Sequence, residues 1–246
     1  MWGKIKQPVR KLIAAVFWLI VWQCAAFAVG NQLLLPGPYA TIKCLAELVP
    51  TVRFWRAVGM TLLRVAGGFL LGALCGTILA ILTAKSSVVN DLLSPMFNII
   101  KATPVSSFIL LVLLWLSASL TPMLIAFLMV VPIIWSALRQ AIVDVDAELI
   151  EMARFFRIPR GRTLKALYIP AIRSQFLAAA TTALGFAWKS GVAAEVIATP
   201  AFSIGRSIYE SKLYLETPEL FAWTAAVVLL SVVLEKAFVS IVRRAV

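Results

Sequence analysis

Residues 102–138 read ATPVSSFILLVLLWLSASLTPMLIAFLMVVPIIWSAL, a stretch of 37 residues without a charged side chain between Lys101 and Arg139. A helix needs about 20 apolar residues to cross the roughly 30 Å of hydrocarbon in a bilayer. The stretch is therefore too long for a single crossing. Small, polar and proline residues at 117–122 predict a tight turn, so we expect two membrane helices joined as a hairpin.

Four further apolar segments predict four more crossings. They lie at residues 12–29, at 65–84 together with the preceding turn that contains Arg64, from about 171 to 189 or 198, and from about 219 to 242. Hydrophobic residues make up 62% of the chain and charged residues 14%, against about 45–50% and 25% in soluble domains. The sequence therefore predicts an all-α, polytopic membrane protein with six transmembrane helices and both termini on the same side.

The first apolar segment has an alternative interpretation as a cleaved secretory signal. Basic residues precede it, and Ala26-Phe27-Ala28 imitates an A-x-A cleavage site. Its 18 residues are longer than the apolar region of most signals, and five more predicted crossings follow. We therefore interpret it as an uncleaved first span.

Basic residues are distributed unequally between the two sides of the predicted membrane. Sixteen of the 23 lysines and arginines fall at the chain ends and in the loops after the second and fourth spans, whereas six fall on the opposite side. Loops rich in Lys and Arg stay in the cytoplasm, so both termini are predicted to be cytoplasmic. The formal net charge of +12 then reports membrane topology, and nucleic-acid binding is disfavoured.

Several classes of site are disfavoured by the residues present. The chain has no histidine and only three scattered cysteines without a C-x-x-C spacing, which argues against a metal site. It has no G-x-x-x-x-G-K-[ST] motif, so it is not expected to hydrolyse ATP. An intramembrane enzyme is also disfavoured, because it would need paired carboxylates, a histidine or a Ser/Lys arrangement within the apolar spans, and none is found there. An ion-gradient-driven secondary transporter, which we keep as the alternative, would need acidic residues inside its spans, and the first four spans have none.

The second span carries a stripe of small residues. Gly68, Gly72 and Gly76 repeat at intervals of four residues. Such a stripe lets two helices approach closely in lipid. We therefore expect this span to lie inside the helix bundle.

The loop between the fourth and fifth spans, residues 139–173, carries dense charge of both signs. Acidic residues precede a run of arginines, an order that suits a helix dipole, and Asp144 or Asp146 is a candidate N-cap. Residues 158–161 are expected to end this helix, and residues 163–168 to begin a second short one. The pattern alone fits a docking element for a soluble partner as well as a solvated loop that only enforces topology.

This loop resembles the EAA loop of binding-protein-dependent ABC importer permeases, whose pattern is E-A-A, three residues, G, nine residues and I-x-L-P. The same spacing here reads Glu151-Met152-Ala153, Arg157 and Leu167-Tyr168-Ile169-Pro170. Arg157 departs from the pattern in the glycine position, and Gly161 is a candidate to supply the flexibility instead. Segments at 61–69, 104–105, 190–197 and 204–224 resemble the nitrate/sulfonate/taurine class of these permeases, so the resemblance covers about residues 35–245.

The resemblance implies the permease subunit of an importer, with the type I ABC importer permease fold, in the bacterial inner membrane. It implies a homodimer, two ATPase subunits that bind ATP and Mg, an external solute-binding protein, and a small polar or anionic solute such as a sulfonate, taurine or nitrate. No cofactor or metal is implied for this chain. One permease domain would comprise a first span with an external segment (1–56) and a five-span core (57–246) that contains the coupling loop at 139–173. Within the 144–170 segment, the implied ATPase contacts are Glu151, Met152, Ala153, Arg154, Arg157, Ile158, Pro159, Gly161 and Pro170.

Four residues are candidates for a substrate path: Arg64, Trp188, Ser190 and Glu195. A charge at mid-bilayer costs about 2.5–3.5 kcal/mol on translocon scales, so Arg64 either lines a path for an anion or is a structural partner of Glu195 or of a carbonyl group. Lys189 and Glu195 either pair as a gate or extend to the interface. The tryptophans are mostly interpreted as interfacial or packing residues.

Overall fold

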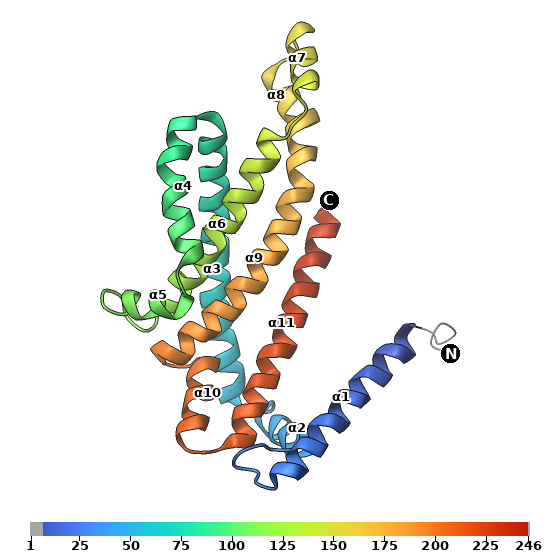
Figure 1. Ribbon diagram of the computed structural model, residues 1–246, viewed down its shortest axis with the longest axis vertical. Coiled ribbons are helices and arrows are strands. Elements are labelled where there is room, and N and C mark those ends of the chain that lie inside the picture. Colours follow the sequence, from blue (N-terminus) through green and yellow to red (C-terminus); the bar gives the residue numbers. More distant parts are fainter. Residues whose placement is uncertain (1–6, 246) are drawn as a thin grey trace.

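The computed structural model describes residues 7–245, and every regular element within this range is a helix (Figure 1). The elements are α1 (Gln7–Val29), α2 (Pro38–Leu48), α3 (Val52–Lys85), α4 (Ser87–Ala102), α5 (Val105–Val112), α6 (Thr121–Val143), α7 (Ala147–Phe155), α8 (Arg160–Thr163), the π-helix η2 (Leu164–Tyr168), α9 (Ile169–Ala198), α10 (Ile204–Leu213) and α11 (Thr217–Ala245). The predicted all-α class is confirmed for the described residues.

The long helices α3, α6 and α9 form the centre of the bundle. Helix α6 packs extensively against both α3 and α9. Helices α7 and α8 lie at one end of the molecule, and α2 and α10 lie at the opposite end (Figure 1). We call these the α7 end and the α10 end. Helix α1 projects sideways from the α10 end, where it contacts α2 (Figure 1).

The glycine stripe on α3 allows α6 to approach closely. A Cβ added to Gly72 would lie 2.8 Å from Cβ of Val130, and one added to Gly76 would lie 2.9 Å from the carbonyl oxygen of Val131. At Gly68 an added Cβ would overlap the α6 backbone. Helices in lipid associate largely through such close van der Waals packing. The prediction that this span lies inside the bundle is confirmed.

Three helices are each long and apolar enough to cross a bilayer, namely α3, α6 and the Thr217–Ile241 part of α11. Helices α4 and α5 meet this criterion only as a pair, and they are bent by 103° relative to each other. Helix α9 has 30 residues but is less apolar, because polar residues such as Lys189 interrupt it. The apolar part of α1, Ile13–Val29, is shorter. These helices indicate a multi-pass membrane protein.

The position predicted for the third span is wrong. The residues expected to form a loop, 86–101, are mostly the helix α4, whereas the expected span after residue 101 contains only the eight-residue helix α5. The break falls at Thr103-Pro104, where Thr103 has an extended backbone (φ −81°, ψ 132°). A residue before proline avoids the helical conformation, and proline itself offers no N–H to the helix.

This correction changes the charge count slightly. Lys85 and Lys101 lie at opposite ends of α4, which has 16 residues and is about 24 Å long at 1.5 Å per residue. They therefore do not share a loop. Without Lys101 the larger set of basic residues has fifteen members instead of sixteen, so the asymmetry between the two sides persists.

The other expected boundaries agree better with the structure. Turns at 113–120 separate α5 from α6, so the predicted turn is confirmed, although α5 is too short to be the first arm of a hairpin of two spans. Helix α9 continues to Ala198, which is the longer of the two expected ends. Among the tryptophans, Trp188 and Trp223 are buried in the core, whereas Trp18, Trp55 and Trp115 are exposed on apolar surface.

Candidate functional site

The coupling loop begins with a well-capped helix. The Asp146 side chain accepts a hydrogen bond from the backbone N–H of Glu148 at 2.9 Å and so caps the N-terminus of α7. Glu148 in the first turn and Arg154 in the last complement the helix dipole. Of the two aspartates predicted as caps, Asp146 is the cap, and Asp144 instead accepts a hydrogen bond from Gln140.

Arg157 retains the tight turn that the family pattern assigns to glycine. Its φ is +52°, in the left-handed region. The N–H of Ile158 donates to the carbonyl oxygen of Ala153 at 2.9 Å, and the N–H of Arg157 donates to that of Arg154 at 3.0 Å. These two bonds define a Schellman motif, which satisfies carbonyl groups at the end of α7. Gly161 lies inside α8 without a positive φ, so the left-handed turn is at Arg157 and not at Gly161.

The second helix of the loop is continuous with α9. It begins at Arg160, earlier than the expected residue 163, and passes through the π-helix η2 into α9. The N–H of Ile169 donates to the carbonyl oxygen of Leu164, one residue further back than in an α-helix. Pro170 explains this change, because it has no N–H for the carbonyl of Ala166 and its ring crowds that group. Proline in the I-x-L-P position therefore marks a local widening of the helix.

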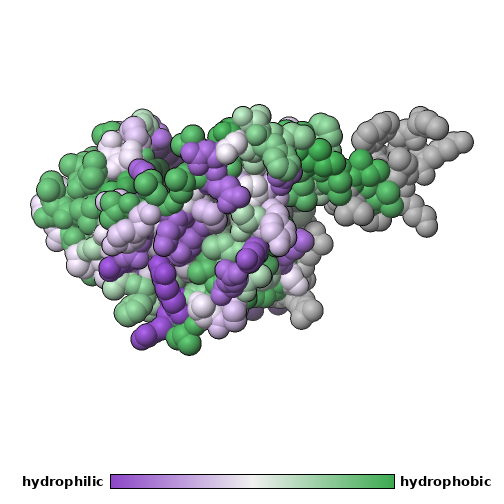
Figure 2. Space-filling model, turned by 90° about the horizontal axis from the view of Figure 1, so that it is seen from below, coloured by the Kyte–Doolittle hydropathy of each residue, from purple (hydrophilic) through white to green (hydrophobic). Residues whose placement is uncertain are grey.

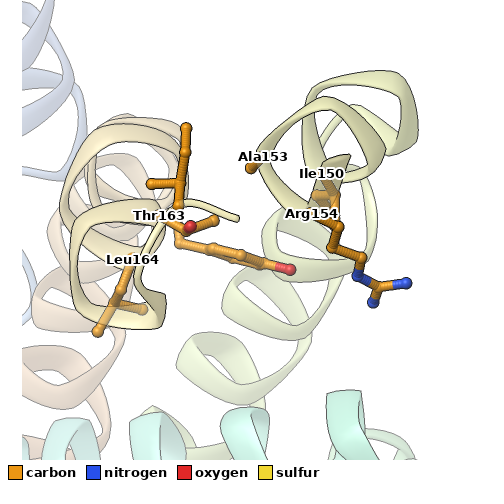
Figure 3. A pocket seen from close by; sticks show the side chains of 7 residues that line it. Ile150, Ala153, Arg154, Thr163 and Leu164 are labelled. Carbon is orange, nitrogen blue, oxygen red and sulfur yellow. The ribbon is translucent and has the colours of Figure 1, made fainter. Parts of the chain in front are cut away.

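A pocket of about 530 Å³ lies between α7 and the α8–η2 segment. It is lined by Ile150, Ala153, Arg154, Ile158, Thr163, Leu164 and Tyr168. Ala153 is buried and faces the segment that carries Thr163 and Leu164, whereas the Arg154 guanidinium extends away from it (Figure 3). Ala153 therefore allows the two halves of the loop to approach each other and does not itself form an outer surface.

The outer surface of α7 is apolar and aromatic. Phe155 is 82% exposed and Phe156 is 66% exposed, and their rings meet edge to face with centroids 5.4 Å apart. Met152 and Ile158 are also exposed, and Glu151 lies beside them on the surface. Neither phenylalanine is among the ATPase contacts that the family resemblance implies. Two adjacent phenylalanines at the end of a charged helix are the signal that identifies this surface.

Arg64 on α3 and Glu195 on α9 form a buried ion pair. Nη1 of Arg64 lies 3.1 Å from Oε1 of Glu195, and the two side chains are 7% and 0% exposed. Buried ions need further hydrogen bonds to offset their desolvation. The Arg64 guanidinium donates to the carbonyl oxygens of Ala201 at 3.0 Å and Phe202 at 3.5 Å. This is the arrangement that the structural alternative for Arg64 predicts.

The same carboxylate caps α10. The N–H of Gly205 donates to Oε2 of Glu195 at 3.3 Å, the hydroxyl of Thr61 donates to the same oxygen at 2.7 Å, and the N–H of Ile204 donates to the Thr61 hydroxyl at 3.1 Å. Free N–H groups and the partial positive charge at a helix N-terminus favour an anion there. We call Thr61, Arg64 and Glu195 the buried cluster. It connects α3, α9 and α10 at the α10 end.

The remaining candidates for a substrate path lie apart from this cluster. Trp188 is buried and donates its Nε1–H to the carbonyl oxygen of Val227 at 3.1 Å, and Ser190 is buried and donates to that of Ala187 at 3.3 Å. The proposed gate between Lys189 and Glu195 is wrong, because Glu195 pairs with Arg64 and the Lys189 side chain is exposed. All four candidate path residues are thus buried within the chain.

A network of partly exposed ion pairs lies at the α10 end. Nη2 of Arg53 lies 3.5 Å from Oε2 of Glu210 and its Nη1 lies 3.5 Å from Oε1 of Glu219, while Nε of Arg206 lies 2.6 Å from Oε1 of Glu210. A hydrogen bond and the negative charge of Glu219 raise the pKa of the nearby Glu216 carboxyl. Within residues 7–245, no group of three or more His, Cys, Asp or Glu side chains is arranged to hold a metal ion.

Comparison with known proteins agrees with the motif in the coupling loop. Residues 68–246 match the family described as binding-protein-dependent transport system inner membrane component. The chain is 27% identical to SsuC of Bacillus subtilis, named for transport of aliphatic sulfonates (88% of this chain and 82% of SsuC aligned). It is 23% identical to the taurine permease TauC of Escherichia coli (94% and 86%) and 24% identical to the bicarbonate permease CmpB of Synechococcus elongatus (79% and 73%).

Proposed function

Because this chain belongs to the family of binding-protein-dependent transport system inner membrane components, we propose that it forms the transmembrane path of an ATP-driven ABC importer. In this proposal a separate ATPase subunit binds ATP and Mg, and this chain transmits the resulting movement. The ion-gradient-driven alternative is not favoured, since the relatives are named as permeases of ABC systems. Uptake that persists after ATP depletion would favour it instead.

The observation that carries the proposal is the exposed aromatic surface at the tip of α7. Helices α7 and α8 extend beyond the rest of the bundle at the α7 end (Figure 1). Phe155 and Phe156 present large apolar rings there, surrounded by charged side chains. Exposed aromatic anchors within a polar rim are typical of the energetic centres of protein interfaces. The proposed occupant is a groove of the ATPase subunit, with Glu151, Met152 and the turn at 157–159 beside the anchors.

The proposed topology has six crossings, formed by α1, α3, the α4–α5 pair, α6, α9 and α11. It places the α7 end and both chain termini in the cytoplasm and the α10 end outside, in a bacterial inner membrane. The excess of basic residues on the α7 side supports this orientation. Residues 1–56 are then the first span with its external segment, and residues 57–246 are the five-span core.

The proposed assembly contains two copies of this chain, two ATPase subunits and an external solute-binding protein. The cargo we propose is a small polar or anionic solute of the sulfonate, taurine or bicarbonate kind. The names of the relatives support this choice, because all of these solutes carry an oxyanion group. Discrimination among them is assigned to the binding protein.

Replacement of both phenylalanines by alanine tests the docking role. We expect the Phe155→Ala/Phe156→Ala variant to insert into the membrane normally but to lose co-purification with the ATPase and uptake of labelled taurine. Each anchor of this kind contributes about 2 kcal/mol or more, so the double variant should weaken binding by roughly a thousandfold. Phe27→Ala is the matched control, since Phe27 is also largely exposed but lies on α1. Normal co-purification of the double variant would contradict the proposal.

A further inference from the structure

A pocket of about 390 Å³ opens at the α10 end, away from the coupling loop. Its walls are the first two turns of α3, the linker between α9 and α10, and the first two turns of α10. The lining residues include Arg53, Ala201, Phe202, Arg206 and Glu210. This volume is within the range that holds small ligands. Viewed from this end, hydrophilic side chains gather towards the middle of the face, between apolar flanks (Figure 2).

The pocket carries an excess of guanidinium groups. Arg53 and Arg206 both line it, and Glu210 is the single carboxylate among its lining residues. Arg53 is already paired with Glu210 and with Glu219, which lies outside the lining, so the binding of a ligand depends on Arg206. A third guanidinium, that of Arg56, stacks 4.6 Å from the ring centroid of Phe202 at the edge. Glu210 engages Arg206 through Nε only. Within the described chain, the two terminal nitrogens of Arg206 make no hydrogen bond, so they are available to a ligand.

The linker that forms one wall of the pocket is bound by the buried cluster. Thr199 and Phe202 in the linker both have positive φ, 48° and 52°, which non-glycine residues adopt only at an energetic cost. The linker keeps this shape because Arg64 of the buried cluster binds the carbonyl groups of Ala201 and Phe202. A preformed wall lowers the entropy that the pocket must lose when a ligand binds.

We infer that this pocket is a binding site for the oxyanion group of a small organic acid, which it receives before the solute enters the bundle. A guanidinium fork matches the paired oxygens of a sulfonate or carboxylate and binds them with two parallel hydrogen bonds. Glu210, which is bonded to Arg206 through Nε, is the carboxylate beside this fork that would accept an amino group, so an amino sulfonate fits as well as a simple one. The inference rests on the proposed function for the placement of the α10 end outside the cell and for the entry of the solute into the bundle.

Thiol chemistry at the pocket tests the site directly. Cys24, Cys44 and Cys75 are replaced by alanine in the full chain, and a single cysteine is placed at Ala201, an exposed lining residue, or at Ala46, an exposed residue of α2 outside the pocket. Each protein, in neutral detergent, is treated with the anionic reagent sulfonatoethyl methanethiosulfonate and with its trimethylammonium counterpart. A positively charged cleft concentrates anions. The rate of modification by the anionic reagent, divided by the rate for the cationic reagent, should therefore be roughly tenfold higher at Ala201→Cys than at Ala46→Cys.

Ethanesulfonate is then added as the competing ligand at constant ionic strength. We expect it to slow modification of Ala201→Cys in a saturable manner and to leave Ala46→Cys unchanged. Arg206→Gln should abolish this protection, and Arg206→Lys should weaken it, because lysine keeps the charge but loses the fork. Lys212→Gln removes one charge from the same helix outside the pocket and should leave the protection intact.

Three results would overturn the inference. The first is equal slowing at both cysteines, and the second is protection that survives Arg206→Gln. The third is protection by added phosphatidylglycerol but not by ethanesulfonate, which would make the pocket a site for lipid headgroups. The assay uses neither ATP nor the ATPase, so its outcome is separate from a failure of the docking proposal.

Discussion

Removal of the Glu195 carboxylate should destabilise the chain strongly. Glu195→Ala takes away the acceptor of three hydrogen bonds, from Arg64 (3.1 Å), Thr61 (2.7 Å) and Gly205 (3.3 Å). It also leaves the Arg64 guanidinium without its counter-ion. Loss of one partner of a buried pair typically costs 3–5 kcal/mol. Because the carbonyl groups of Ala201 and Phe202 still bind Arg64, we expect the free energy of unfolding to fall by an amount near the lower limit, about 3 kcal/mol.

Unfolding of the purified chain by SDS in mixed micelles measures this loss. Tryptophan fluorescence reports the transition, because Trp188 and Trp223 are buried in the folded chain. Glu47→Ala is the matched control, since Glu47 forms an exposed pair with Lys43 at 3.9 Å. An exposed pair contributes at most about 1 kcal/mol. We therefore expect the control to change the free energy of unfolding far less than Glu195→Ala does.

A double-mutant cycle isolates the ion pair from the other contacts. Arg64→Met should cost less in the Glu195→Gln background than in the parent chain, because no carboxylate is then left unpaired. The expected difference is about 2 kcal/mol, within the range for residues in direct contact. A loss below about 1 kcal/mol for Glu195→Ala, or additive effects in the cycle, would refute the assignment of the pair as a structural element.

Two smaller changes, Arg157→Gly and Glu216→Gln, probe the ends of other helices, and Arg162→Gly is the control for the first. Arg157→Gly should stabilise the chain by about 1 kcal/mol, because glycine adopts a positive φ without the steric cost that arginine bears. Arg162→Gly, inside α8, should instead destabilise the chain by about 1 kcal/mol. The same SDS titration measures both changes in the free energy of unfolding. The pKa of the Glu216 carboxyl is raised above its ordinary value of 4.5 by Glu219. Its contribution to stability is therefore present at low pH and lost as the pH rises through the raised pKa. Glu216→Gln should remove this loss, so the midpoint of thermal unfolding should fall less between pH 4 and pH 7 than in the parent chain, and an equal fall in both would contradict this account.

Local features of the coupling loop could be predicted from the sequence because they depend on neighbouring residues. A cap such as Asp146 and the spacing from Glu151 to Pro170 are set within a few helical turns. The left-handed turn at Arg157 could not be predicted from composition, since arginine does not favour that conformation. The turn is nevertheless stabilised by the two hydrogen bonds of the Schellman motif.

Features that depend on long-range packing were predicted less well. Arg64 and Glu195 are 131 residues apart in the chain, so the sequence left several partners open, and the nearby Lys189 was an equally reasonable choice for Glu195. The third span was misplaced because charged residues were used as its limits. Lys101 is tolerated at the end of α4, where its ammonium group lies 5.6 Å from the ring centroid of Trp135, and the true break is set by Pro104.

Helix α9 runs without interruption from the coupling loop to the buried cluster, and this continuity constrains how the chain can change in evolution. Each residue of an α-helix turns its successor by about 100°. A one-residue insertion or deletion between Pro170 and Glu195 would therefore rotate the carboxylate away from Arg64, or else rotate the coupling loop on its axis. An insertion or deletion here keeps both the coupling loop and the Arg64–Glu195 pair in orientation only when its length is close to a whole number of helical turns, for example about seven residues.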